Sequence, residues 1–164
     1  MKPFGGQTMW GPLRRVMVRR PDAAFGNADP ARWHYTARPL LPEAVTEHDE
    51  FLALLRDAGA EVVFHDEPLD DHADAIFCHD PVLVTDAGAI LLRMGKPLRR
   101  GEEAALGRAL ERVGVPTAAR IEGEGLAESG DLMWLDSATL AVGIGFRTNR
   151  EGMAQLARAL PGVE

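Results

Sequence analysis

Apolar residues follow one recurring pattern along this chain, and the pattern is written twice. Residues 83–114 and 133–164 align at a fixed offset of fifty positions without a gap, with nine identities. Most other apolar positions of one copy meet apolar positions of the other. A period of this size is typical of a propeller or another array of supersecondary units. We therefore expect one small folding unit that recurs along the chain.

Each copy predicts two strands, a helix and a returning strand. Two short apolar runs flank a turn at 86–88 or 136–138, where Asp and Gly or small residues suit a hairpin. Residues 102–113 place apolar side chains on one helical face, and Gly114 is suited to end that helix. The stretch 115–121 would return to the sheet, which makes the unit β-β-α-β. The apolar face comprises Ala105, Leu106, Ala109, Leu110 and Val113.

A partial copy precedes these two. Residues 13–18 predict a strand, 43–58 a helix and 61–65 a closing strand. Residues 20–42 show neither period and indicate a long connection, either a lid or binding loop or an ordinary surface excursion. The helix is expected to bury Phe51, Leu52, Leu54 and Leu55.

These patterns predict a single incomplete domain over residues 1–164. It would consist of a partial unit, 13–66, and units 74–121 and 124–164, the last cut short. By the offset, Glu164 corresponds to Gly114, the residue at which the helix should end and the closing strand should follow. We therefore expect the N-terminal part of a longer protein, with one sheet edge unpaired.

Composition narrows the class of partner. At 164 residues and 46% hydrophobic, the chain can bury a single-domain core. One cysteine excludes an internal disulfide framework and suits a reducing cytoplasm. The sequence has no apolar run that could span a bilayer, and the net charge of −7 argues against nucleic acid or an anionic membrane as a partner. The charge suits a cationic small molecule, although acidic proteins are often acidic merely for solubility.

Carboxylates precede both hairpins. Asp80 leads into the first and Glu128 into the second, and Asp80 aligns with Gly130 at the offset of fifty. If the units surround an axis, the two carboxylates converge, and converging carboxylates match the fork of N–H donors on a guanidinium. The alternative is equally open at this point: both residues satisfy turn N–H groups or pair with local arginines.

Five short motifs, in order and spacing, resemble the pentein guanidino-modifying enzymes. The set looks most like dimethylarginine dimethylaminohydrolase, with arginine deiminase and the amidinotransferases as neighbours. The resemblance implies an α+β fold, the α/β propeller of penteins, with about three of five expected β-β-α-β units around a pseudo-symmetry axis. The motifs are residues 13–21, Phe77-x-x-Asp80, 99–102, Glu128-x-Gly-Asp131 and 145–149.

The resemblance also implies roles for single residues. Asp80 matches the carboxylate that grips a substrate guanidinium, Glu128 a second acidic residue beside it, and Asp74 another polar contact. Arg99 and Arg147 match arginines that orient the substrate's α-carboxylate, for which a fork-to-fork pair is the physical basis. Most arginines in polar loops are only solvated, and that remains the ordinary alternative. The implied reaction converts arginine or a methylated arginine to citrulline and an amine, and no cofactor or metal is expected.

The two groups that perform the covalent chemistry in this family are expected beyond Glu164. These are a cysteine nucleophile and a proton-transfer histidine, so residues 1–164 alone are expected to be inactive. Cys78 cannot substitute, because it directly precedes His79 and adjacent strand residues point to opposite faces. We interpret Cys78 as a buried small residue. His79 stands where the dimethylarginine enzymes carry an acidic residue, which leaves the exact substrate open.

Two other kinds of function stay open. Penteins include a non-catalytic binding protein, a ribosome anti-association factor, and the chain could also be one half of a split arginine deiminase or amidinotransferase. The corresponding partner would be a second copy in a homo-oligomer or a complementing C-terminal half. Asp80 and Glu128 together with the two arginines favour the enzyme family.

Overall fold

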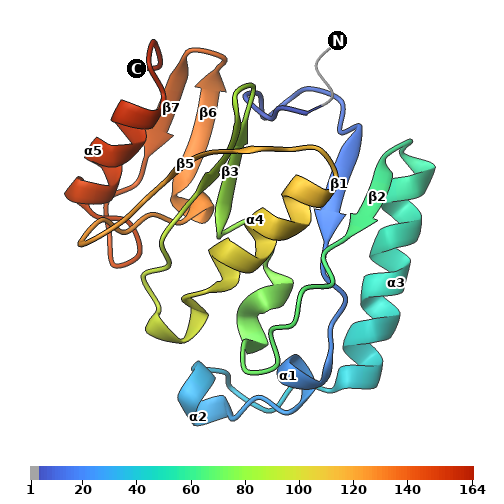
Figure 1. Ribbon diagram of the computed structural model, residues 1–164. Coiled ribbons are helices and arrows are strands. Elements are labelled where there is room, and N and C mark those ends of the chain that lie inside the picture. Colours follow the sequence, from blue (N-terminus) through green and yellow to red (C-terminus); the bar gives the residue numbers. More distant parts are fainter. Residues whose placement is uncertain (1–3) are drawn as a thin grey trace. The chain divides into compact units, whose positions relative to one another are not determined.

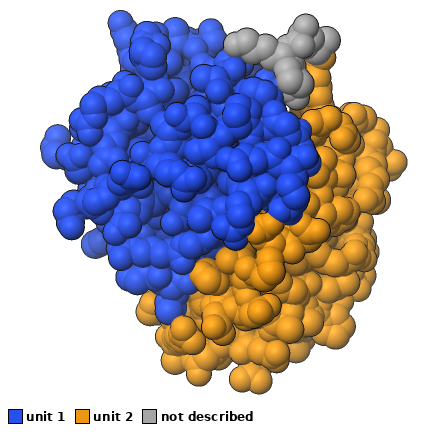
Figure 2. Space-filling model, in the orientation of Figure 1, with its two compact units in different colours: residues 1–11, 79–164 blue, residues 12–78 orange. Residues whose placement is uncertain are grey.

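The computed structural model describes residues 4–164, and their contacts divide the chain into two compact units. Of the described residues, one unit comprises 4–11 and His79–Glu164, and the other comprises Pro12–Cys78 (Figure 2). Within residues 4–164, no helix is long and apolar enough to cross a membrane. The two units are described in turn, beginning with residues 12–78.

The unit of residues 12–78 is a pair of parallel strands with a helix between them in sequence. Strand β1 (Arg15–Val18) pairs with β2 (Glu61–Phe64), and α3 (Leu41–Asp57) leads from one to the other (Figure 1). The predicted strand, helix and closing strand are thereby confirmed. Two short helices, α1 (Ala23–Gly26) and α2 (Pro30–Trp33), occupy the long connection.

Helix α3 does not bury the stripe that the sequence predicted. Leu52 is buried, but Phe51 is half exposed and Leu54 is 68% exposed. Residues 51 and 54 turn away because the buried side follows the helical period through Val45, His48 and Leu52, at steps of three and four. The expectation was wrong for Phe51 and Leu54, because the predicted stripe was centred to one side of the buried one. Leu52 is buried and Leu55 is half-buried, as expected.

The segment around Cys78 also differs from the prediction, in which Cys78 and His79 are adjacent residues of a strand. Ala73–Ile76 is a short 3₁₀ helix, η1, and residues 78–80 form a turn. The N–H of Ala75 donates to His72 O, and that of Phe77 donates to Asp74 O. These bonds span three residues, so side chains here do not alternate between two faces as they would in a strand.

The second unit contains both copies of the repeat. In the first copy, β3 (Val82–Thr85) and β4 (Gly88–Leu91) form an antiparallel hairpin. After η2 (Pro97–Arg99) and α4 (Glu102–Arg112), β5 (Thr117–Arg120) lies parallel to β4 (Figure 1). This order confirms the β-β-α-β unit.

Two details of the first copy follow from single residues. Gly88 has φ +131°, and a Cβ there would lie 2.4 Å from Pro116 O, so only glycine fits where β5 passes the turn. On α4, Ala105, Leu106 and Ala109 are buried, as the predicted apolar face requires.

The second copy begins with η3 (Ser129–Asp131) and repeats the hairpin with β6 (Leu132–Asp136) and β7 (Thr139–Val142). Helix α5 (Arg150–Ala159) follows. The backbone of Glu164 then donates to Ala138 O and accepts from Leu140 N–H, both at 2.8 Å. The edge of β7 is therefore not wholly unpaired, contrary to the expectation from the sequence.

The two copies share one hydrophobic core and are joined through their backbones. The N–H of Ala127 donates to Arg93 O at 3.0 Å, and that of Ser129 donates to Asp80 O at 2.9 Å. Apolar burial is the main stabilising contribution of such a core. The core contains Leu83, Ile90, Leu92, Ile121, Ala127, Leu132, Trp134, Leu140, Leu156 and Leu160.

Candidate functional site

Asp80 lies in the turn before β3, at the point where the two copies meet. Its carbonyl accepts the Ser129 N–H, which brings the first copy against the start of the second. Its Oδ1 lies 3.1 Å from the position that a Cβ on Gly130 would occupy. The segments that carry the two predicted carboxylates therefore converge, as the repeat predicted.

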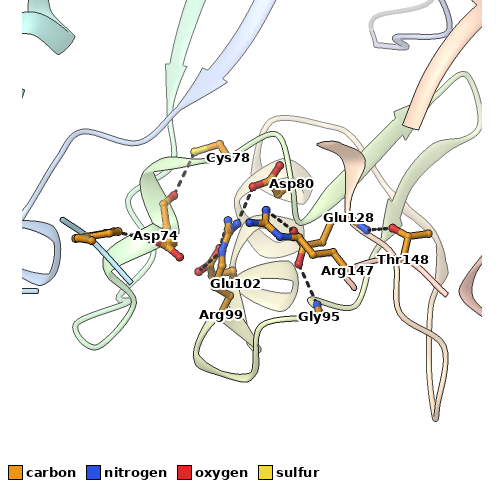
Figure 3. A network of polar contacts seen from close by, with 11 residues as sticks. Asp74, Cys78, Asp80, Gly95, Arg99, Glu102, Glu128, Arg147 and Thr148 are labelled. Carbon is orange, nitrogen blue, oxygen red and sulfur yellow. Dashed lines mark hydrogen bonds and ion pairs between the residues drawn. The ribbon is translucent and has the colours of Figure 1, made fainter. Parts of the chain in front are cut away.

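Arg99, at the end of η2, holds the other oxygen of Asp80. Its Nη1 donates to Asp80 Oδ2 at 2.6 Å, while Nε and Nη2 donate to Glu102 over 2.8–3.1 Å (Figure 3). The Arg99 side chain is only 3% exposed, and Glu102 is equally buried. Two donors to one carboxylate fix the guanidinium plane, which a single bond would not do.

The charge of Arg99 is stabilised by its partners. Burial disfavours the charged guanidinium, but hydrogen bonds and charge from Glu102, then from Asp80, outweigh burial and raise the pKa of Arg99 above its ordinary value. The arginine is therefore a fixed cation between two acidic side chains.

The Asp80 carboxylate is paired with Arg99 through one of its two oxygens. Its side chain is 18% exposed. Among the contacts of residues 4–164, Oδ2 is paired with Arg99 and Oδ1 accepts no hydrogen bond. One carboxylate oxygen is thus held in place while the other is available to a ligand.

Glu128 is a buried carboxylate at the start of η3. Its Oε1 accepts the Gly95 N–H at 3.0 Å, and its Oε2 accepts from Arg147 Nη1 at 3.3 Å (Figure 3). Its backbone N–H donates to Thr148 Oγ1. Burial raises the pKa of Glu128, against the opposing effects of the Gly95 N–H, Arg147 and Arg99, and Asp80 raises it further.

Arg147 is far more exposed than Arg99 and is held less firmly. Its side chain is 61% exposed, and its link to Glu128 is one long contact. The backbone of Arg147 lies close to Gly95. A Cβ added to Gly95 would lie 2.7 Å from Arg147 Cα, which explains the glycine at position 95. An exposed arginine held by one contact can reorient at little cost.

The structure brings together four of the five predicted site residues. Asp80, Glu128, Arg99 and Arg147 lie in one compact unit, whereas Asp74 belongs to the other. Asp74 is buried and accepts the Tyr35 hydroxyl at 2.5 Å. The pairing of carboxylates with local arginines, which the sequence left as an alternative, is present at both Asp80 and Glu128.

Sequence reasoning missed roles for two residues. Glu102 is the last residue of the 99–102 motif, and its spacing of three from Arg99 was a signal for an ion pair at a helix start. Tyr35 stands in the long connection, where its contact with Asp74 could not be foreseen because no period links the two segments.

Cys78 is not the buried residue that the sequence predicted. It is half-buried, and its thiol donates to Ala75 O at 3.6 Å, while His79 is exposed. The expectation assumed a strand, whereas residues 78–80 form a turn. Within residues 4–164, no three side chains of His, Cys, Asp or Glu gather as metal ligands.

Solved structures define the class of fold. The chain superposes with TM-score 0.76 on a variant of Pseudomonas aeruginosa dimethylarginine dimethylaminohydrolase complexed with citrulline, at 26% identity over 90% of this chain and 56% of that one. It also matches the substrate-bound N-terminal domain of a cyanobacterial arginine dihydrolase, at TM-score 0.75 and 20% identity, over 91% of this chain and 55% of that chain. The fold is the α+β pentein fold that the resemblance implied.

Sequence comparisons define the family. The family model for eukaryotic N,N dimethylarginine dimethylhydrolase matches residues 16–164, so the chain belongs to the dimethylarginine dimethylaminohydrolase family. The enzyme of that name from Streptomyces coelicolor is 33% identical, over 90% of this chain and 56% of its own length. The one from Pseudomonas aeruginosa is 29% identical, over 88% and 55%. The chain spans about half the length of these curated relatives.

Proposed function

We propose that this chain supplies the guanidinium-binding part of a hydrolase of the dimethylarginine dimethylaminohydrolase type. The reaction would add water to arginine or a methylated arginine and release citrulline, together with ammonia from arginine or an amine from a methylated arginine. The observation that carries the proposal is Asp80, one oxygen of which is fixed by Arg99 while the other accepts no hydrogen bond within residues 4–164. Such an oxygen suits an N–H of a planar cation.

Each of the remaining site residues is assigned a part in holding the substrate. Glu128 would add negative charge beside Asp80, and Arg147 would turn from Glu128 toward the substrate's α-carboxylate. Asp74 would contribute a further polar contact. Arg99 would orient the same carboxylate, as the resemblance implies, and its hydrogen bonds to acidic side chains would also hold Asp80 in place.

The nucleophile and the proton-transfer histidine would come from outside residues 1–164. Either the polypeptide continues past Glu164 or a partner polypeptide supplies these groups, as a homo-oligomer or as a complementing half. Cys78, the one cysteine of this sequence, lies in the other compact unit from Asp80 and bonds to Ala75. We place the protein in the cytoplasm, where a single cysteine would stay reduced.

The test compares two ligands that differ in charge at one end only. L-arginine carries a guanidinium, whereas L-citrulline carries a neutral ureido group on the same amino-acid end. We expect the chain to prefer arginine by about tenfold in calorimetric titration, and Asp80→Asn to remove that preference. Arg147→Ala should weaken both ligands alike, because both carry the α-carboxylate. Equal binding of arginine and citrulline by the wild-type chain would contradict the proposal.

A turnover assay separates the enzyme from a non-catalytic pentein binding protein. The observation in favour of a non-catalytic binding protein is that Asp80 and Glu128 are already paired with arginines. Citrulline release should be absent for residues 1–164 alone and should require the polypeptide that carries the nucleophile. Turnover by 1–164 that disappears in Cys78→Ala would assign the nucleophile to Cys78 instead.

A further inference from the structure

We infer that Glu102 is a positioning residue of the guanidinium site: it fixes Arg99 and balances its charge, so that Asp80 keeps its own charge for the ligand. The inference rests on the proposed function and adds to it a residue that does not touch the substrate. Its basis is a chain of three side chains, Glu102, Arg99 and Asp80, within one compact unit (Figure 3).

The first step is geometric. Nε and Nη2 of Arg99 form one edge of the guanidinium, and Glu102 accepts from both, at 3.1 and 2.8 Å. This two-point contact fixes the plane of the guanidinium. Nη1 is then aimed at Asp80 Oδ2, at 2.6 Å. Asp80 is thereby held by one oxygen, and the direction of Oδ1 is set indirectly by Glu102.

The second step concerns charge. Arg99 and Asp80 alone would form a neutral pair, and a neutral pair attracts a cationic ligand weakly. The Glu102 carboxylate restores a net negative charge to the group, and it does so in a buried position where charges are poorly screened. Glu102 therefore makes Arg99 a fixed hydrogen-bond donor without letting it cancel the charge of Asp80.

The third step explains why Glu102 stands at this point of the fold. It is the first residue of α4, where the free backbone N–H groups of the helix favour negative charge. Glu103, the next residue, is half-buried and accepts the Gly101 N–H, and among residues 4–164 it forms no hydrogen bond or ion pair with Arg99. The two neighbours share the helix terminus and the charge, but only Glu102 pairs with Arg99.

The experiment uses that pair of neighbours. Glu102→Gln and Glu103→Gln each remove one negative charge from the same helical turn. Arginine affinity of the 164-residue chain should fall about tenfold in Glu102→Gln and stay within about twofold in Glu103→Gln, with citrulline affinity unchanged in both. Adding Asp80→Asn to Glu102→Gln should cost less arginine affinity than the sum of the two single losses, because Glu102 acts in part through the position of Asp80. Equal losses in the two glutamine variants, or additive losses in the double variant, would overturn the inference.

A second readout does not depend on the ligand. The Nε–H proton of Arg99 should give a slowly exchanging NMR signal in the wild type and in Glu103→Gln, and this signal should vanish in Glu102→Gln. If the wild type does not prefer arginine to citrulline, the proposed function is wrong. The NMR signal of Arg99 would still show whether Glu102 fixes the Arg99 side chain. A signal that persists in Glu102→Gln refutes the positioning role.

A third variant covers loss of folding. Should Glu102→Gln not fold, Arg99→Met combined with Glu102→Leu replaces the buried ion pair by apolar side chains of similar size, which usually preserves stability. This variant should lose the preference for arginine, because Asp80 is no longer held. A retained preference would refute the inference.

Discussion

The starts of helices α4 and α5 occupy equivalent places in the two copies of the repeat, yet they are built in different ways. At the offset of fifty, Arg99 and Glu102 correspond to Asn149 and Gly152. The first pair is a buried ion pair. In the second, Asn149 Oδ1 accepts from both Gly152 N–H and Leu126 N–H, at 2.8 and 3.0 Å.

The difference lies in what the helix start is packed against. A Cβ on Gly152 would lie 1.9 Å from Leu126 O, so α5 approaches the preceding segment too closely for any side chain at that position. In α4 the same position carries a glutamate that reaches Arg99. One copy uses the site for close backbone packing and the other for a buried charge. The repeat therefore supplies the scaffold, and the candidate chemistry lies where the copies differ.

The largest effect is expected from breaking the ion pair of the first copy. Glu102→Ala should lower the free energy of unfolding by about 3–5 kcal/mol, because Arg99 would remain buried and lose its main partner. Urea unfolding measures the change. Glu103→Ala is the matched control and should cost less than about 1 kcal/mol. Similar losses of unfolding free energy in the two variants would contradict a stabilising role for the buried Arg99–Glu102 pair.

A smaller loss is expected from filling the corresponding position of the second copy. Gly152→Ala places a methyl group against backbone atoms that cannot rotate away, and should cost about 1–3 kcal/mol by the same measurement. Gly145→Ala serves as the control, since a Cβ there meets no atom within 4 Å. If Gly152→Ala were as stable as Gly145→Ala, the close packing of α5 could not explain why the copies differ.

The smallest effect concerns Glu128 and depends on pH. Its pKa is raised in the folded chain, so its stabilising contribution is present below its ordinary value of 4.5 and is lost as pH rises through the folded pKa. Glu128→Gln removes this titration. The variant should gain stability relative to the wild type as pH rises above 4.5, which would appear as a difference in melting temperature that grows with pH. A difference that is independent of pH, or that grows toward low pH, would contradict the raised pKa.

The sequence predicted the fold where periodicity and turn chemistry agree. The β-β-α-β order, the hairpin with its turn at 86–88 and the apolar face of α4 were all predicted from local patterns. Local patterns were misleading at Phe51 and Leu54, which are apolar yet exposed, and around Cys78, where a 3₁₀ helix (Ala73–Ile76) and a turn replace the expected strand.

The sequence predicted which residues form the candidate site, but not how they are buried and paired. The resemblance named Asp80, Glu128 and both arginines, and the fold brings these four into one compact unit. It did not reveal that Arg99 is buried between two carboxylates, because burial depends on how η2 and α4 pack and not on the motif itself. The assigned roles of these residues remain predictions.

The backbone bonds between the copies have a consequence for how this unit unfolds. The N–H groups of Ala127 and Ser129 donate to carbonyls of the first copy, and both copies contribute to one core. Opening either copy alone would break these bonds and expose apolar surface on the other. In a simple array, a repeat can fray on its own and cooperativity decays with distance. We therefore expect the two copies to unfold as a single cooperative unit, so that amide protons in both exchange with solvent through the same global opening.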